Sequence, residues 1–111
     1  MSIGPEEKTL VLIAGEIKSP PFSVGARREA GRLLGRVQAG ETLGMPHSRP
    51  MPSIGRNVNE LRVRDEDHNW RIIYRADARI VLVIEIFEKK TPTTPKHVIE
   101  LCRKRLRDWD A

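Results

Sequence analysis

The chain has 111 residues, of which 39% are hydrophobic and 32% charged, and its formal net charge at pH 7 is +5. This length is typical of one domain, so we expect residues 1–111 to form a single fold. The longest apolar run, 80–84, is too short to cross a bilayer, and no secretion signal is recognisable, so a cytoplasmic protein without membrane contact is expected. The positive charge favours an acidic partner such as a nucleic acid without identifying one.

In chain order, the first expected element is a short buried strand over Lys8–Ala14, where aliphatic and β-branched residues run together. A helix follows from Ser23, whose hydroxyl suits the N-cap position. Its core-facing residues recur at helical spacing: Ala26, Ala30, Leu33, Leu34 and Val37. The prolines and glycines of Gly40–Gly55 then argue against a continuous helix or strand and predict a long connection.

Three strands are expected in the second half, over Val58–Arg64, Trp70–Ala76 and Arg79–Phe87. The segments between them are short and polar, which predicts hairpins and an antiparallel meander. The third strand is almost continuously apolar, as expected for a central strand covered on both faces. A last helix begins near Pro95, and its core-facing residues include Cys102, for which a packing role is favoured over redox or metal chemistry. The expected fold is therefore α+β, in the order β-α-loop-β-β-β-α.

Four short segments in the middle of the chain are more specific together than any one of them alone. They are Leu43-Gly44-Met45-Pro46 with Ser48-Arg49-Pro50, Glu60-Leu61-Arg62-Val63-Arg64, Trp70-Arg71-Ile72-Ile73-Tyr74, and Phe87-Glu88-Lys89-Lys90-Thr91-Pro92. In this order and spacing, within one basic chain of this length, they resemble the HigB-type, phage-derived branch of the RelE superfamily of toxins. Weaker similarity extends the resemblance to residues 24–107.

The resemblance implies a ribosome-dependent mRNA endoribonuclease that inhibits translation. It implies a RelE-like fold in which helices pack on one face of a twisted, mostly antiparallel sheet while the other face forms the RNA cleft. It also implies that no metal or organic cofactor is used. The expected partners are mRNA on the ribosome and a helix-turn-helix antitoxin, which would neutralise the toxin in a hetero-oligomer.

RNA cleavage by its own 2′-OH needs a base for that hydroxyl, donors for the charge that develops on the phosphate, and an acid for the departing 5′-oxygen. A metal ion could supply these functions. However, His47, His68 and His97 are scattered, with no close His or Cys companion, so no metal site is expected. Side chains must then carry the chemistry.

Strand alternation predicts where the cationic side chains converge. Arg62 and Arg64 share one face of their strand, and Arg71 together with Lys89 and Lys90 can reach the same patch if the strands pair antiparallel. By resemblance, Arg62 and Arg64 match the basic pair of the superfamily, and Arg71 matches its transition-state-stabilising arginine. Lys90, with Lys89 beside it, matches the site of a general acid or phosphate contact. The alternative for the two lysines is a solvated turn.

The sequence departs from the family pattern at two positions. Glu85 stands where many relatives carry a histidine; it could act as a base if buried, or position Arg62, and the second role is favoured because a nearby arginine stabilises the charged carboxylate. His97 occupies the region where some relatives use a tyrosine, so it could donate a proton or simply be exposed. Arg62 itself could form an ion pair with Glu60 or Glu85 that only organises the sheet.

Two further alternatives concern the aromatic residues and the function as a whole. Trp70 could stack on an RNA base, but Trp70 and Tyr74 are more simply interpreted as core residues beneath the sheet. The same basic cleft would suit a non-catalytic RNA- or ribosome-binding module. The departures at Glu85 and His97 also allow a toxin-derived protein-interaction domain that has lost activity.

Overall fold

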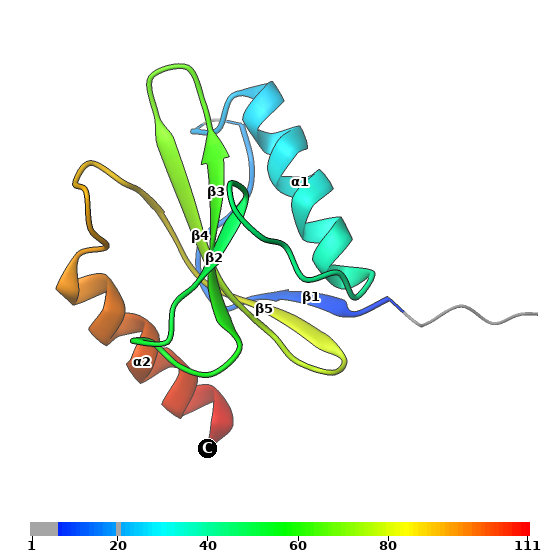
Figure 1. Cartoon of the computed structure of the whole chain (residues 1–111), viewed down its shortest axis with the longest axis vertical. Helices are drawn as coiled ribbons and strands as arrows, with labels where there is room; N and C mark the ends of the chain where they lie inside the picture. Colours follow the sequence, from blue (N-terminus) through cyan, green and yellow to red (C-terminus); the bar gives the residue numbers. More distant parts are fainter. Residues whose placement is uncertain (1–6, 20) are drawn as a thin grey trace, which may run out of the picture.

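The computed structural model describes residues 7–19 and 21–111. Its elements in chain order are β1 (Thr9–Leu12), α1 (Val24–Gln38), β2 (Ser48–Pro50), β3 (Val58–Arg64), β4 (Asn69–Ala76), β5 (Ile80–Glu88) and α2 (Lys96–Asp110). Figure 1 shows the strands as one central layer with the two helices beside it. The α+β class and the three C-terminal strands agree with the sequence-based expectation to within one or two residues at each boundary.

The strands form a single five-stranded sheet in the order β1-β5-β4-β3-β2. The strand β1 runs parallel to β5, and the remaining neighbours are antiparallel, so the predicted meander and the mostly antiparallel sheet are confirmed. The strand β2 was not expected, because its residues lie in the proline-rich connection. Pro50 is compatible with this position because β2 is an edge strand, where a missing backbone N–H costs no ladder hydrogen bond.

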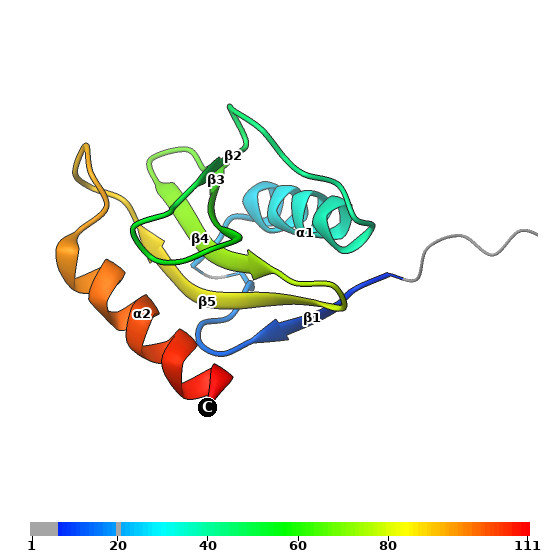
Figure 2. The same ribbon diagram turned by 60° about the horizontal axis from the view of Figure 1, so that its bottom comes forward.

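The two helices cover opposite faces of the sheet, so the expectation that they share one face is wrong. Alternate residues of β5 point to the two faces: Val81 and Val83 pack in a core with α1, whereas Leu82 and Ile84 pack in a second core with α2. Figure 2 shows α1 and α2 on either side of the strands. A strand that is apolar on both faces must be covered on both, which is the physical reason for the arrangement.

Cys102 belongs to the core beneath α2. Its side chain is fully buried, and burial raises the pKa of its thiol to about 12. The predicted packing role of this residue is confirmed. Within the described ranges, neither helix combines the length and the apolarity that crossing a bilayer requires.

The start of α1 is attached to the turn between β3 and β4. Ser23 is the N-cap, as predicted, and its hydroxyl accepts a hydrogen bond from the Ala26 amide at 3.0 Å. The Ser23 amide in turn donates to Asp65 Oδ2 at 2.9 Å, and the Trp70 indole N–H donates to the same oxygen at 3.2 Å. These hydrogen bonds, led by the one from the Ser23 amide, lower the pKa of Asp65.

Asp65→Asn is therefore expected to lower the free energy of unfolding at pH 7, and the difference from wild type should become smaller once the pH falls below about 4. A carboxylate whose pKa is lower in the folded than in the unfolded state stabilises the protein above its unfolded pKa, about 3.9, and this contribution is lost as the pH falls. Urea unfolding at pH 7 and pH 3 measures the effect. Asp67→Asn, an exposed change in the same turn, is the control; an equal loss for Asp65→Asn at both pH values would contradict the charge-based explanation.

Candidate active site

Arg62 and Arg71, two of the cationic residues predicted from strand alternation, share one face of the sheet, and it is the face that α2 partly covers. Arg62 and Arg71 are direct cross-strand partners in the β3–β4 pairing. They lie on the same side as Val58 and Ile73, which pack in the α2 core. The site therefore lies beside α2 and not on a helix-free face, which corrects the expectation of an RNA cleft opposite both helices.

The centre of this face is a carboxylate, Glu60, whose side chain is 0% exposed. Its Oε1 atom lies 3.2 Å from Arg49 Nε, 3.5 Å from Arg71 Nε and 3.6 Å from Lys89 Nζ. Its Oε2 atom accepts a hydrogen bond of 2.7 Å from the Thr94 hydroxyl. We refer to Arg49, Arg62, Arg71 and Lys89 around Glu60 as the cationic cluster.

Positive charge exceeds negative charge in the cationic cluster. Three cationic side chains contact one carboxylate, and a fourth, Arg62, acts on Arg71 and Lys89 as a like charge and forms no ion pair with any residue in the described part of the chain. The Nε atoms of Arg62 and Arg71 are buried and have no hydrogen-bond partner among the described residues. Leaving a buried donor unsatisfied costs about 1–3 kcal/mol, more when the group is charged. An anion bound here would satisfy these donors and reduce the repulsion between adjacent guanidinium groups.

Burial and mutual repulsion also change the proton affinities of the cluster. Burial lowers the pKa of Arg71, and the neighbouring guanidinium groups of Arg62 and Arg49 lower it further, while Glu60 opposes them. The pKa of Lys89 is likewise lowered, first by burial and then by Arg49, Arg71 and Arg62, again against Glu60. Lys89 therefore gives up its proton more readily than an exposed lysine, whereas an arginine remains charged at any working pH.

A groove of about 570 Å³ opens beside the cationic cluster. Arg62, Arg64 and Arg71 line it, and the half-buried His47 lines it as well. The remaining lining residues are Glu29, Pro46 and Asn69. Arg62 and Arg71 of the cationic cluster are thus accessible from solvent through this groove.

Other candidates lie outside the cationic cluster. Lys90 is exposed, whereas the Lys89 side chain is only 6% exposed and reaches Glu60. Glu85 Oε2 lies 3.4 Å from Arg105 of α2, so in this structure Glu85 is paired with α2 and does not position Arg62. His97 is exposed in the first turn of α2.

Trp70 lies on the opposite face from the cationic cluster. It is 8% exposed, belongs to the α1 core, and stacks on Phe22 with ring centroids 4.6 Å apart. Tyr74 belongs to the same core, and its hydroxyl lies 2.9 Å from Ser48 Oγ. The interpretation of both aromatics as core residues is confirmed, and Trp70 is not available to stack on a base in the groove.

Sequence reasoning missed Arg49 and His47, and it did not recognise Glu60 as the centre of the site. Arg49 is the direct partner of Glu60 in the β2–β3 pairing, so its place depends on a three-residue strand inside a segment expected to be irregular. The one available signal was the alternation of β3, which puts Glu60 on the same face as Arg62. Thr94, just before α2, had no sequence signal for its contact with Glu60.

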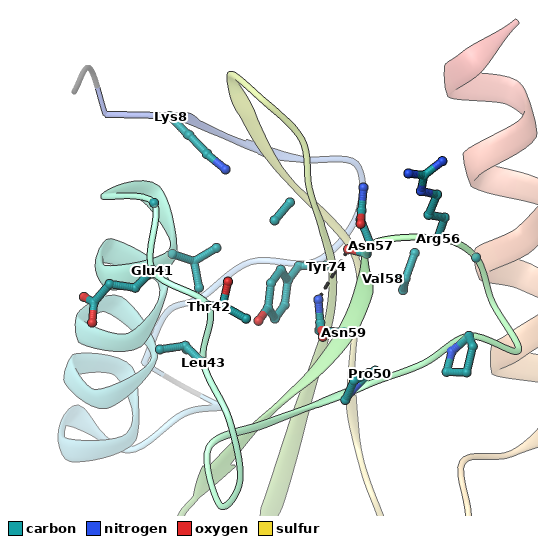
Figure 3. Close-up of a pocket in the computed structure, with 15 residues that line it drawn as sticks. Lys8, Glu41, Thr42, Leu43, Pro50, Arg56, Asn57, Val58, Asn59 and Tyr74 are labelled. Carbon is teal, nitrogen blue, oxygen red and sulfur yellow. Dashed lines mark hydrogen bonds between the residues drawn. The ribbon is translucent and has the colours of Figure 1, made fainter.

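A second cavity, of about 410 Å³, lies between the end of α1 and the connection from β2 to β3 (Figure 3). Lys8 and Arg56 are the cationic residues that line it, and they lie on either side of Tyr74 in Figure 3. This arrangement lacks the converging cations of the first site, so the cationic cluster is the better candidate for binding a phosphate. Across residues 7–19 and 21–111, no three His, Cys, Asp or Glu side chains come together as a metal site.

Comparison with known families agrees with this geometry. Residues 20–107 match the profile of the family described as phage-derived protein Gp49-like (DUF891). The match includes α1, every strand of the cationic cluster and most of α2. No curated protein matches the chain closely enough to add to this comparison. The chain therefore belongs to the phage-derived Gp49-like family, a family of toxins of toxin–antitoxin systems of the RelE/HigB type.

Proposed function

We propose that this toxin is a HigB-type, ribosome-dependent mRNA endoribonuclease that inhibits translation. The observation that supports the proposal most lies beside an open groove, where the buried Nε atoms of Arg62 and Arg71 have no hydrogen-bond partner among the described residues. Of the two, Arg71 Nε alone has a carboxylate, Glu60, within ion-pair distance. Such donors suit a phosphate, because a guanidinium can grip two of its oxygens. The RNA backbone supplies phosphates at regular intervals, and membership of the toxin family makes messenger RNA the expected substrate.

In the proposed reaction, the RNA 2′-oxygen attacks the adjacent phosphorus, the bond from phosphorus to the 5′-oxygen breaks, and the products carry a 2′,3′-cyclic phosphate and a 5′-hydroxyl. Arg71 and Arg62 hold the phosphate and stabilise the charge that builds on its oxygens. Lys89 donates the proton to the departing 5′-oxygen, a role that its lowered pKa favours. His47 lines the same groove and accepts the proton of the 2′-OH.

The remaining cations bind the flanking RNA in this proposal. Arg64 is exposed at the end of β3 and lines the groove, so it can contact a neighbouring phosphate. Lys90, exposed beyond β5, is a second candidate for such a contact. Exposed contacts of this kind contribute to affinity in a salt-dependent way and do not stabilise the transition state specifically.

Dependence on the ribosome follows from what lines the groove. Its lining residues include no Phe, Tyr or Trp, so apart from the His47 ring it offers mainly charge and little aromatic surface on which a base could stack. Stacking contributes about 1–3 kcal/mol per base in proteins that hold single-stranded RNA by themselves. We propose that the ribosome provides this missing constraint by holding the mRNA in the geometry that the site cleaves.

Expression of the chain without an antitoxin is expected to arrest growth and to shorten translated mRNAs, whereas purified RNA alone should be cut poorly. Growth curves together with mapping of mRNA 5′ ends measure both effects. Arrest without any new mRNA ends would favour the non-catalytic ribosome-binding alternative. Normal growth at high expression, or efficient cleavage of free RNA, would contradict the proposal.

The proposal includes a cognate antitoxin with a helix-turn-helix domain, which forms a hetero-oligomer with the toxin. To neutralise the toxin, it must cover or distort the cationic cluster. A flexible acidic segment that folds on binding would complement the excess positive charge. A complex in which Arg62, Arg71 and the groove stay open and undisturbed would contradict this mode of inhibition.

A further inference from the structure

We infer that Glu60 is a positioning residue of the active site, which holds Arg49, Arg71 and Lys89 in place and does not itself exchange protons with the RNA. The inference rests on the proposed function and deepens it. Its support is the geometry around a carboxylate that is fully buried at the centre of four chain segments.

The contacts of Glu60 argue against a role as the general base. A base must come within hydrogen-bond reach of the 2′-OH whose proton it removes. The Glu60 side chain is 0% exposed. Its Oε1 atom faces Arg49, Arg71 and Lys89, and its Oε2 atom accepts a hydrogen bond from the Thr94 hydroxyl. No oxygen is left for the substrate.

The same contacts explain how Glu60 assembles the site. Arg49 comes from β2, Arg71 from β4, Lys89 from the end of β5, and Thr94 from the segment before α2. Only β2 and β4 flank β3 in the sheet, so Lys89 and Thr94 reach Glu60 through their side chains alone. Without the negative charge of Glu60, the side chains of Arg49, Arg71 and Lys89 would repel one another and would lose the group that orients them. A buried cation left without its counter-ion is strongly disfavoured.

Glu60 also controls the proton on Lys89. Among the charges around Lys89, Glu60 raises its pKa, whereas Arg49, Arg71 and Arg62 lower it. Removing the Glu60 charge must therefore lower the pKa of Lys89 further. If Lys89 is the proton donor, it would be deprotonated at a lower pH, and the fall of the cleavage rate at high pH would begin earlier.

Glu60→Gln tests the inference, because glutamine has nearly the same shape as glutamate and lacks the charge. Two measurements are combined: the pH titration of the Lys89 side chain by NMR on the free protein, and the pH profile of single-turnover cleavage on programmed ribosomes. We expect the pKa of Lys89 to be lower than in wild type and the cleavage rate at saturating ribosomes to be reduced about tenfold or more. The fall of the cleavage rate at high pH should begin at a lower pH than in wild type. Circular dichroism checks that the variant is folded.

Glu88→Gln is the matched control. It removes a carboxylate next to Lys89 in the sequence, but Glu88 pairs with His68 at 2.9 Å and lies opposite Trp70, on the other side of the sheet. The control should leave the cleavage rate near wild type and the Lys89 titration changed much less than in Glu60→Gln. An unchanged Lys89 titration in Glu60→Gln, or a wild-type cleavage rate and pH profile, would overturn the inference.

The two measurements separate this inference from the proposed function. If the wild-type protein cleaves no mRNA, the proposed function fails, and the Lys89 titration still decides whether Glu60 organises the cationic cluster. If Glu60→Gln does not fold, Thr94→Val decides instead, since it removes only the hydrogen bond to Oε2. Cleavage slowed about threefold or more, with unchanged ribosome affinity, would support the inference, and a wild-type rate would overturn it.

Discussion

Arg71→Ala is expected to slow single-turnover cleavage on programmed ribosomes by about a hundredfold or more, with little change in the affinity for ribosomes. Removing one donor that stabilises a developing oxyanion typically costs a factor of this size. Arg71 fits that role because its Nε is buried without a hydrogen-bond partner and its side chain lines the groove. Since the interaction is made mainly in the transition state, the loss should appear in the rate at saturation.

Arg28→Ala is the control for Arg71→Ala. Arg28 is exposed on α1, on the far side of the sheet, so its loss should affect only the salt-dependent affinity for the ribosome or the antitoxin. Circular dichroism must show that both variants are folded. A wild-type rate for Arg71→Ala would contradict its assignment to the catalytic site.

Lys89→Ala is expected to reduce the cleavage rate about a hundredfold, whereas Lys90→Ala should reduce it far less. The two lysines are adjacent in the sequence, but Lys89 Nζ lies 3.6 Å from Glu60 Oε1 while Lys90 is exposed. General acid catalysis contributes about a hundredfold or more. The proton donor must carry its proton, so wild-type cleavage should fall as the pH rises through the lowered pKa of Lys89. This high-pH fall should be absent from Lys89→Ala.

The comparison between adjacent lysines is informative because sequence resemblance alone favoured Lys90. Single-turnover rates of both variants between pH 6 and pH 10 decide between them. A hundredfold loss in Lys90→Ala together with near-normal activity in Lys89→Ala would show that Lys90, and not the buried lysine, performs the chemistry.

Much of the sheet could be predicted because strand periodicity is a strong physical signal. Alternation along β3 and β4 placed Arg62 and Arg71 on one face, and the short turns between strands required antiparallel pairing. The near-continuous apolar sequence of β5 also predicted cover on both faces. The expectation of helices on one face conflicted with that prediction, and the structure agrees with the apolar pattern of β5.

The parts of the site that escaped prediction depend on long-range contacts. Lys89 and Lys90 follow the last residue of β5, where strand alternation no longer fixes which side chain points to the site. Arg49 reaches Glu60 through a short edge strand, and nothing local in a proline-rich segment specifies that pairing. A buried glutamate is rare unless paired, so the role of Glu60 becomes visible only when its counter-ions are located.

The most direct test of the account is to map mRNA 5′ ends in a reconstituted translation reaction containing purified protein, with and without ribosomes. We predict new ends within translated codons when wild-type protein and ribosomes are both present, few ends on free RNA, and about a hundredfold fewer for Arg71→Ala. New ends that are equally frequent without ribosomes, or equally frequent with folded Arg71→Ala, would contradict the account.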